Sequence, residues 1–313
     1  MLGRNAGGLF WMFRYLERSE NTARLLDTGF RIALTASDGA ETEWESIIST
    51  TGVREQYLEK FDTFEQAQVI NYLLRDKDNP SSVMSMFDGA RTNARMVRTA
   101  LSSEVWEATN EAWMNIKQIL ARPVSVKNLA QVLASIRQHS SQVRGALHGT
   151  MLRNEIFDFA RIGTFVERAD NTARILDVKY YVLLPSAAFI GSSMDNAQWE
   201  TILRSVSAFR SFRWLNEAET TPMAIAQFLI LDRRMPRSLA FCYSKISGNL
   251  RYLAQNHVGE LPCLEMAQEA YARLDNCEIE SIFDEGLHEF LEASIGGTAR
   301  LASQIQQDFR FTR

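Results

Sequence analysis

Apolar residues recur at steps of three and four along most of this chain. The segment from Ala90 to Leu120 follows this spacing, which is typical of helices that bury one face. A second stripe occupies Leu129, Val132, Leu133, Ile136, Val143 and Leu147. No stretch alternates between apolar and polar residues for long enough to indicate a strand. The pattern predicts an all-α fold, a helical bundle.

Segments without this spacing separate the expected helices. They contain the residues that favour turns and read "DKDNPSS" (76–82), "LARPVSVKN" (120–128) and "LLPSAAFIGSSMDN" (183–196). The longest mostly apolar run, "YYVLLPSAAFI" (180–190), is far shorter than the roughly 20 residues that cross a bilayer. We therefore expect helices joined by turns and no membrane-spanning segment.

Two eleven-residue stretches of the chain nearly coincide. "ERSENTARLLD" begins at residue 17 and "ERADNTARILD" at residue 167. Further matches follow in the same order: "TEWESI" with "AQWETI", "LLRDKDNPSS" with "LILDRRMPRS", and Asn93–Arg95 with Asn249–Arg251. This order indicates a tandem duplication, with repeats at about 10–110 and about 160–260 inside a single domain of residues 1–313. We expect the two halves to pack about a pseudo-twofold axis.

On a helix, the repeated polar residues fall on one face, because they lie three and four positions apart. Three interpretations are open: solvated ion pairs, a half-buried network that fixes the helix register, or a face left for a ligand or partner. A solvated face alone does not explain why these residues recur while their neighbours differ. The predicted site residues are Glu17, Arg18, Glu20, Asn21 and Arg24 in the first copy and Glu167, Arg168, Asp170, Asn171 and Arg174 in the second.

A basic stripe follows in the first copy. Arg91, Arg95 and Arg98 lie at steps of four and three, with Asn93 to one side. The second copy has Asn249 and Arg251 at the equivalent of Asn93 and Arg95, which suggests that one half specialised. The stripe suits an acidic partner surface, a phosphate or a carboxylate-bearing peptide, and the alternative is a solvated face.

Several classes of chemistry lack their motifs. The four histidines are not three or four positions from the repeated carboxylates, so we expect no metal site of the paired-iron type. There is no GxSxG, no Cys–His motif and no phosphate-binding glycine loop, and we predict no cofactor. With 34 Lys+Arg against 38 Asp+Glu, the charge balance does not favour nucleic acid. Three cysteines without CxxC spacing, and no apparent signal peptide, predict a cytoplasmic protein.

Taken together, these blocks resemble the bacterial Alpha-E family. The resemblance rests on "LFWMFRYLERSENTARLLD", "DGARTNARMVRTALSSEVWEATN", "FVERADNTARILD" and "MPRSLAFCYSKI", with Phe13 and Ser19 where the family usually has Gly and Ala. It implies an all-helical domain associated, through gene neighbourhoods, with a circularly permuted ATP-grasp ligase, a transglutaminase-like peptidase and sometimes a proteasome-like peptidase. It supplies no catalytic residues.

The resulting hypothesis is a non-catalytic helical subunit that binds an ATP-grasp amidoligase and helps to hold its peptide or amino-acid substrate. In it, Arg24 and Arg174 bind carboxylates, Glu17 and Glu167 hold those guanidiniums or an amine, and the basic stripe docks an acidic surface. One alternative is a stand-alone enzyme with a Glu/Arg-lined cleft that acts on peptides or amides. A second alternative is a purely structural scaffold.

Overall fold

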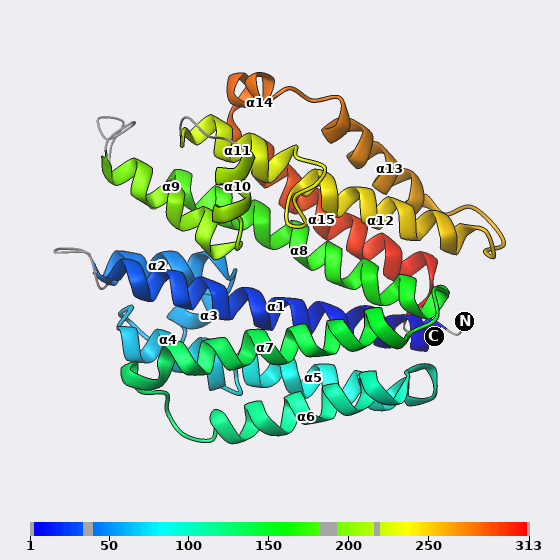
Figure 1. Ribbon diagram of the computed structural model, residues 1–313, viewed down its shortest axis with the longest axis horizontal. Helices are drawn as coiled ribbons and strands as arrows, with labels where there is room; N and C mark the ends of the chain where they lie inside the picture. Colours follow the sequence, from blue (N-terminus) through cyan, green and yellow to red (C-terminus); the bar gives the residue numbers. More distant parts are fainter. Residues whose placement is uncertain (1–2, 34–39, 182–192, 216–219, 312–313) are drawn as a thin grey trace. The chain divides into compact units, whose positions relative to one another are not determined.

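The structure is a computed structural model that describes residues 3–33, 40–181, 193–215 and 220–311. Over these ranges it consists of α-helices and one 3₁₀ turn and contains no strand, which confirms the all-α class. Packing divides the chain into two compact units (Figure 1), and the division falls inside one long helix. The first unit comprises Met1–Glu167 with Phe309–Arg313, and the second comprises Arg168–Asp308.

The first unit is built on an antiparallel four-helix bundle. Its elements are α1 (Gly3–Ala33), α2 (Ala40–Thr50), α3 (Arg54–Leu58), α4 (Gln66–Arg75), α5 (Val83–Met96), the 3₁₀ turn η1 (Arg98–Ala100), α6 (Ser103–Ile119), α7 (Val126–Thr150) and the start of α8 (Glu155–Tyr181). Helices α5 and α7 each pack against both α1 and α6, which closes the ring (Figure 1). This is the up-and-down arrangement of four-helix bundles.

A serine cap separates α5 from α6, within the segment Ala90 to Leu120 whose spacing predicts helix. The hydroxyl of Ser102 accepts a hydrogen bond from the backbone N–H of Val105, so α6 starts afresh after η1. Helix α5 begins in the same way, with the Ser82 hydroxyl accepting from the N–H of Ser85. The predicted helical segment is therefore divided between two helices, because a cap at residue 102 satisfies exposed N–H groups and permits a turn.

The second unit contains the rest of α8 and seven further helices, as far as the structure describes it. They are α9 (Ser193–Ser205), α10 (Phe209–Leu215), α11 (Pro222–Ile230), α12 (Leu239–Ala254), α13 (Pro262–Asp275), α14 (Ile279–Glu285) and α15 (Leu287–Asp308). Helix α13 packs against α12 and α15. The Tyr243 hydroxyl joins α12 to α15 through a 2.8 Å hydrogen bond with Thr298 Oγ1, and His288 of α15 contacts Asp177 of α8 at 2.6 Å.

The paired sequence blocks occupy equivalent elements of the two units. Asp76 accepts a hydrogen bond from the N–H two residues later, and Asp232 does the same, so each forms an Asx turn. Each turn leads to a serine that caps the next helix, Ser82 for α5 and Ser238 for α12. The turns predicted at 76–82 and 120–128 are confirmed. The duplication, its pseudo-twofold axis and the single-domain extent stay predictions.

Two predicted features fall largely on residues that the structure does not describe. Most of the segment 183–196, and most of the apolar run 180–190, lie outside the residues that the structure describes. Among the helices that it does describe, none is long and apolar enough to cross a membrane.

Candidate functional site

The repeated polar face of α1 is buried inside the first unit. Glu17 is 1% exposed, Glu20 0% and Asn21 2%, because α5, α7 and the start of α8 surround this helix. Buried carboxylates need ionic or hydrogen-bonding partners. The burial excludes the solvated-face interpretation for the first copy of the motif and leaves the network and the ligand face.

Arg144 of α7 binds two carboxylates of α1. Its Nη1 donates to Glu17 Oε2 at 3.3 Å, and its Nη2 contacts Glu20 Oε2. The other oxygen of Glu20 accepts from Arg24 Nη2 at 2.6 Å and from Arg24 Nε at 3.0 Å. These bonds join α7 to α1, and the side chains of Arg144 and Arg24 are only 17% and 19% exposed.

Glu167 of α8 is held by two other arginines of α1. Arg18 donates to both of its carboxylate oxygens, from Nε at 2.5 Å and from Nη2 at 2.8 Å, and Arg14 Nε donates to Oε2 at 2.9 Å. Burial opposes the charged form of Glu167, but the attraction and hydrogen bonds of Arg18 and Arg14 outweigh it and lower the pKa of this carboxyl. Glu167 is therefore an ionised anchor between α1 and α8.

The network contains arginines that sequence reasoning did not predict. Sequence reasoning paired Glu17 and Glu167 with Arg24 and Arg174. The structure adds Arg144 as a partner of Glu17 and places Arg14 and Arg18 on Glu167. Arg14 precedes Arg18 by one helical turn, so its position on the same face was a usable signal. Arg144 is 127 residues from Glu17, and no local pattern indicates it.

The second copy of the motif has different partners. Arg168 Nη1 donates to the carbonyl of Pro236 at 3.2 Å, which ties α8 to the turn before α12. Thr172 Oγ1 donates to the next carbonyl, that of Arg237, at 2.8 Å. Arg174 Nε donates to Asp170 on its own helix at 2.8 Å, and Asn171 is half-buried. The two copies of the motif therefore have similar sequences but different environments.

The basic stripe of the first copy is broken and partly covered. Arg98 lies in η1 rather than on α5, with its guanidinium 5.2 Å from the ring of Trp106. Arg91 donates to Asn110 at 2.8 Å and lies 4.0 Å from the ring of Trp113. Arg95 is exposed and Asn93 is half-buried. Cation–π contacts of this kind hold arginines in place without removing their charge.

The equivalent positions of the second unit are simpler. Asn249 is buried and donates to the backbone carbonyl of Lys245 at 2.6 Å, within α12. Arg251, two residues later, is exposed. These two residues do not form a second basic stripe.

The network on α1 suits a clamp better than acid–base chemistry. A general acid needs a carboxyl whose pKa is raised, whereas the pKa of Glu167 is lowered. Within the described ranges, no three His, Cys, Asp or Glu residues lie close enough to hold a metal ion. Carboxylates of α1 and α8 that bind arginines of α1 and α7 fix the positions of these helices.

Comparisons with known proteins place the chain among helical domains. Residues 1–309 match the model of the Alpha-E family, described as a predicted alpha-helical domain with a conserved ER motif. The uncharacterized proteins Mb2597 of Mycobacterium bovis and Rv2567 of Mycobacterium tuberculosis are each 24% identical over 311 residues, which is 92% of this chain and 34% of each relative. The chain thus spans about a third of their length. No solved structure matches it.

Proposed function

Because the chain belongs to the Alpha-E family of helical domains, we propose that it is a cytoplasmic, non-catalytic partner subunit of an ATP-grasp amidoligase. In this proposal it binds the ligase, and with it the peptide or amino-acid substrate, in a system that synthesises or tags peptides. A transglutaminase-like peptidase is a second candidate partner. The Glu-Arg dipeptides at residues 17–18 and 167–168 match the family's description.

The observation that carries the proposal is that arginines already bind the repeated carboxylates. Glu17, Glu20 and Glu167 each bind at least one arginine, and the pKa of Glu167 is lowered. Carboxylates that are bound to arginines hold helices together and are poorly suited to transferring protons. A role in holding partners in place therefore fits them better than catalysis by this chain alone.

We assign ligase binding to the basic surface formed by Arg91, Arg95 and Arg98. Arg95 and Arg98 are exposed, and Arg91 is held over Trp113 beside them. Arg91 and Arg98 contact the rings of Trp113 and Trp106, which pre-organises their guanidiniums to bind carboxylates on an acidic partner. The length of the relatives also supports a partner role, since about two thirds of those proteins lie outside the matched region.

The test is ATP-dependent peptide ligation by the ATP-grasp protein encoded next to this chain, measured with and without the chain. We expect ligation to require the chain, and the two proteins to form a complex at micromolar concentrations. The double variant Arg95→Glu/Arg98→Glu should weaken the complex by about tenfold or more, because it reverses two charges at the surface.

Arg122→Glu is the matched control. Arg122 is exposed in the same unit, between α6 and α7, so its reversal changes the net charge but not the assigned surface. If ligation ignores the chain and no complex forms, the partnership is refuted. If the isolated chain hydrolyses or transfers amides and Glu17→Gln abolishes this activity, the stand-alone enzyme is correct instead.

A further inference from the structure

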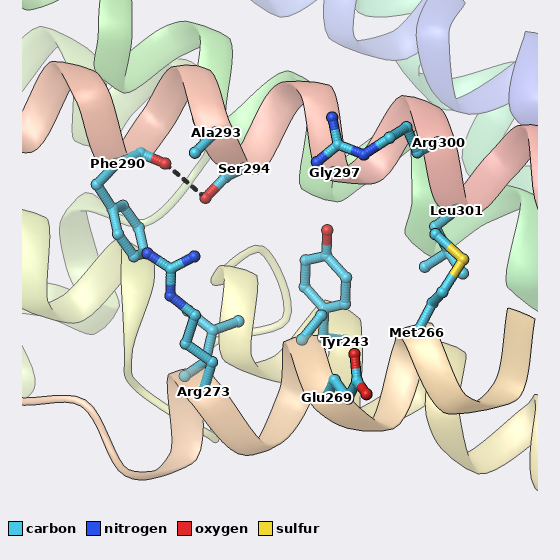
Figure 2. A pocket seen from close by; sticks show the side chains of 12 residues that line it. Tyr243, Met266, Glu269, Arg273, Phe290, Ala293, Ser294, Gly297, Arg300 and Leu301 are labelled. Carbon is cyan, nitrogen blue, oxygen red and sulfur yellow. Dashed lines mark hydrogen bonds between the residues drawn. The ribbon is translucent and has the colours of Figure 1, made fainter.

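A groove of about 310 Å³ lies between α13 and α15 in the second unit, with α12 as its floor (Figure 2). Its apolar lining includes Tyr243, Met266 and Phe290, and its charged residues are Glu269, Arg273 and Arg300. The groove exists because α15 presents small residues here: a Cβ added to Gly297 would meet only the Arg300 guanidinium, at 3.9 Å. All residues that line the groove belong to the second unit, whereas the network on α1 belongs to the first, and the repeated motif contributes no residue to the groove.

The charged residues of the groove are not paired with one another. Glu269 and Arg273 are four residues apart on α13, an arrangement that forms ion pairs at Glu20–Arg24, Asp170–Arg174 and Glu200–Arg204. Arg273 instead turns towards Phe290, whose ring centroid is 5.3 Å from its guanidinium, and Glu269 points away from it (Figure 2). Within the described part of the chain, Glu269, Arg273 and Arg300 form no ion pair.

The floor of the groove is fixed and presents an aromatic ring. Tyr243 is 4% exposed, and its hydroxyl is hydrogen-bonded to Thr298 Oγ1 at 2.8 Å. Its ring lies below Gly297 and between the side chains of Arg273 and Met266 (Figure 2). A ligand in the groove would thus contact apolar surface in its middle and charged groups of both signs around it.

We propose that this groove binds a free α-amino acid with an apolar side chain. Two guanidiniums suit the carboxylate, Glu269 suits the ammonium group, and the rings with Met266 suit the side chain. Glu269 also disfavours a phosphate, which carries more negative charge. A groove of about 310 Å³ has room for a small molecule rather than a folded partner.

This inference bears on the proposed function, since it names the class of substrate that the chain would present to a ligase. The two can fail separately, because amino-acid binding is measured on the isolated chain and ligation on the complex. Bound amino acid with ligation that ignores the chain would refute only the partnership. Ligation that needs the chain, without amino-acid binding, would refute only the groove.

Titration calorimetry at pH 7 with L-phenylalanine, L-leucine and L-methionine tests the proposal. We expect saturable binding of one molecule per chain. N-acetyl-L-phenylalanine lacks the ammonium and L-phenylalaninamide lacks the carboxylate, so each should bind at least about tenfold more weakly. No saturation by any of the three amino acids up to about 10 mM, or equal binding of the acetylated compound, would overturn the proposal.

Variants separate the groove from the rest of the surface. Glu269→Gln and Arg273→Gln should each weaken L-phenylalanine binding by about tenfold, whereas Glu265→Gln and Arg210→Gln, at exposed positions outside the groove, should bind as the wild type does. Gly297→Leu fills the groove without removing a charge and replaces a helical glycine, so it should fold and fail to bind. Unchanged binding by Gly297→Leu would place the ligand elsewhere.

Discussion

At the scale of single residues, Glu167 joins α8 to α1 through three hydrogen bonds from Arg14 and Arg18. Glu167→Gln removes the charge and leaves two guanidiniums facing a neutral amide. We expect it to lower the free energy of unfolding by about 2–4 kcal/mol at pH 7, since unpairing a buried charge is costly. Urea denaturation measures this value.

Glu200→Gln is the control for that measurement. Glu200 pairs with Arg204 and Arg213, whose side chains are 55% and 60% exposed, so its loss should change stability by less than about 1 kcal/mol. Equal effects of the two substitutions would show that Glu167 is not the anchor described here. Because the folded pKa of Glu167 is lowered, its contribution is present above the ordinary pKa and is lost as the pH falls through the folded value.

Asp158, in the first turn of α8, has the opposite shift. Burial raises its pKa to about 6, although Arg161 attracts the charge and lowers it in part. A folded pKa above the unfolded one gives stability that is complete below the unfolded value and is lost as the pH rises through about 6. Asp158→Asn resembles the protonated form, so its advantage over the wild type should grow from near zero at pH 4 to at most about 3 kcal/mol at pH 7. Thermal unfolding across this pH range measures it, and a pH-independent difference would contradict it.

At the scale of elements, Gly163 allows α8 to approach α1 closely. A Cβ on Gly163 would lie 2.2 Å from the backbone oxygen of Phe10, which neither helix can avoid without moving. Gly163→Ala should therefore destabilise the protein by about 1–3 kcal/mol, measured by denaturant unfolding, despite the better helix propensity of alanine. Gly145→Ala on α7 is the control, because its Cβ meets nothing within 4 Å, and it should stabilise by about 0.5–1 kcal/mol. A stabilising Gly163→Ala would refute the close approach.

At the scale of the whole molecule, the end of the chain belongs to the unit in which the chain begins. Phe311 is 8% exposed, and its ring lies 5.3 Å from that of Phe10 and 6.1 Å from that of Phe159. Phe311→Ala should lower stability by about 2–4 kcal/mol, because it leaves a cavity among these rings. Differential scanning calorimetry measures this effect. Leu152→Ala, at a 75% exposed position in the same unit, should leave the melting temperature nearly unchanged. A Phe311→Ala protein that melts as the wild type does would contradict this account.

Local spacing was enough to predict several features of the fold. Apolar steps of three and four predicted helices, and the described residues contain no strand. The segments 76–82 and 120–128 contain capping and turn residues, and the helices end there. The same reasoning failed at residue 102, where the pattern continues but Ser102 caps a new helix. Periodicity records which face of a helix is apolar, and it does not record where the backbone changes direction.

The sequence by itself determined the helical class, the turns and the polar face of the repeated motif, because all of these depend on residues within a few positions of one another. The tertiary structure decided which residues complete that face: Arg144 is 127 residues from Glu17, and Arg14 is 153 residues from Glu167. It also decided that Glu269 and Arg273 point apart, although their spacing favours a pair. Ion partners and grooves depend on which helices pack together, and packing brings together residues that are distant along the chain.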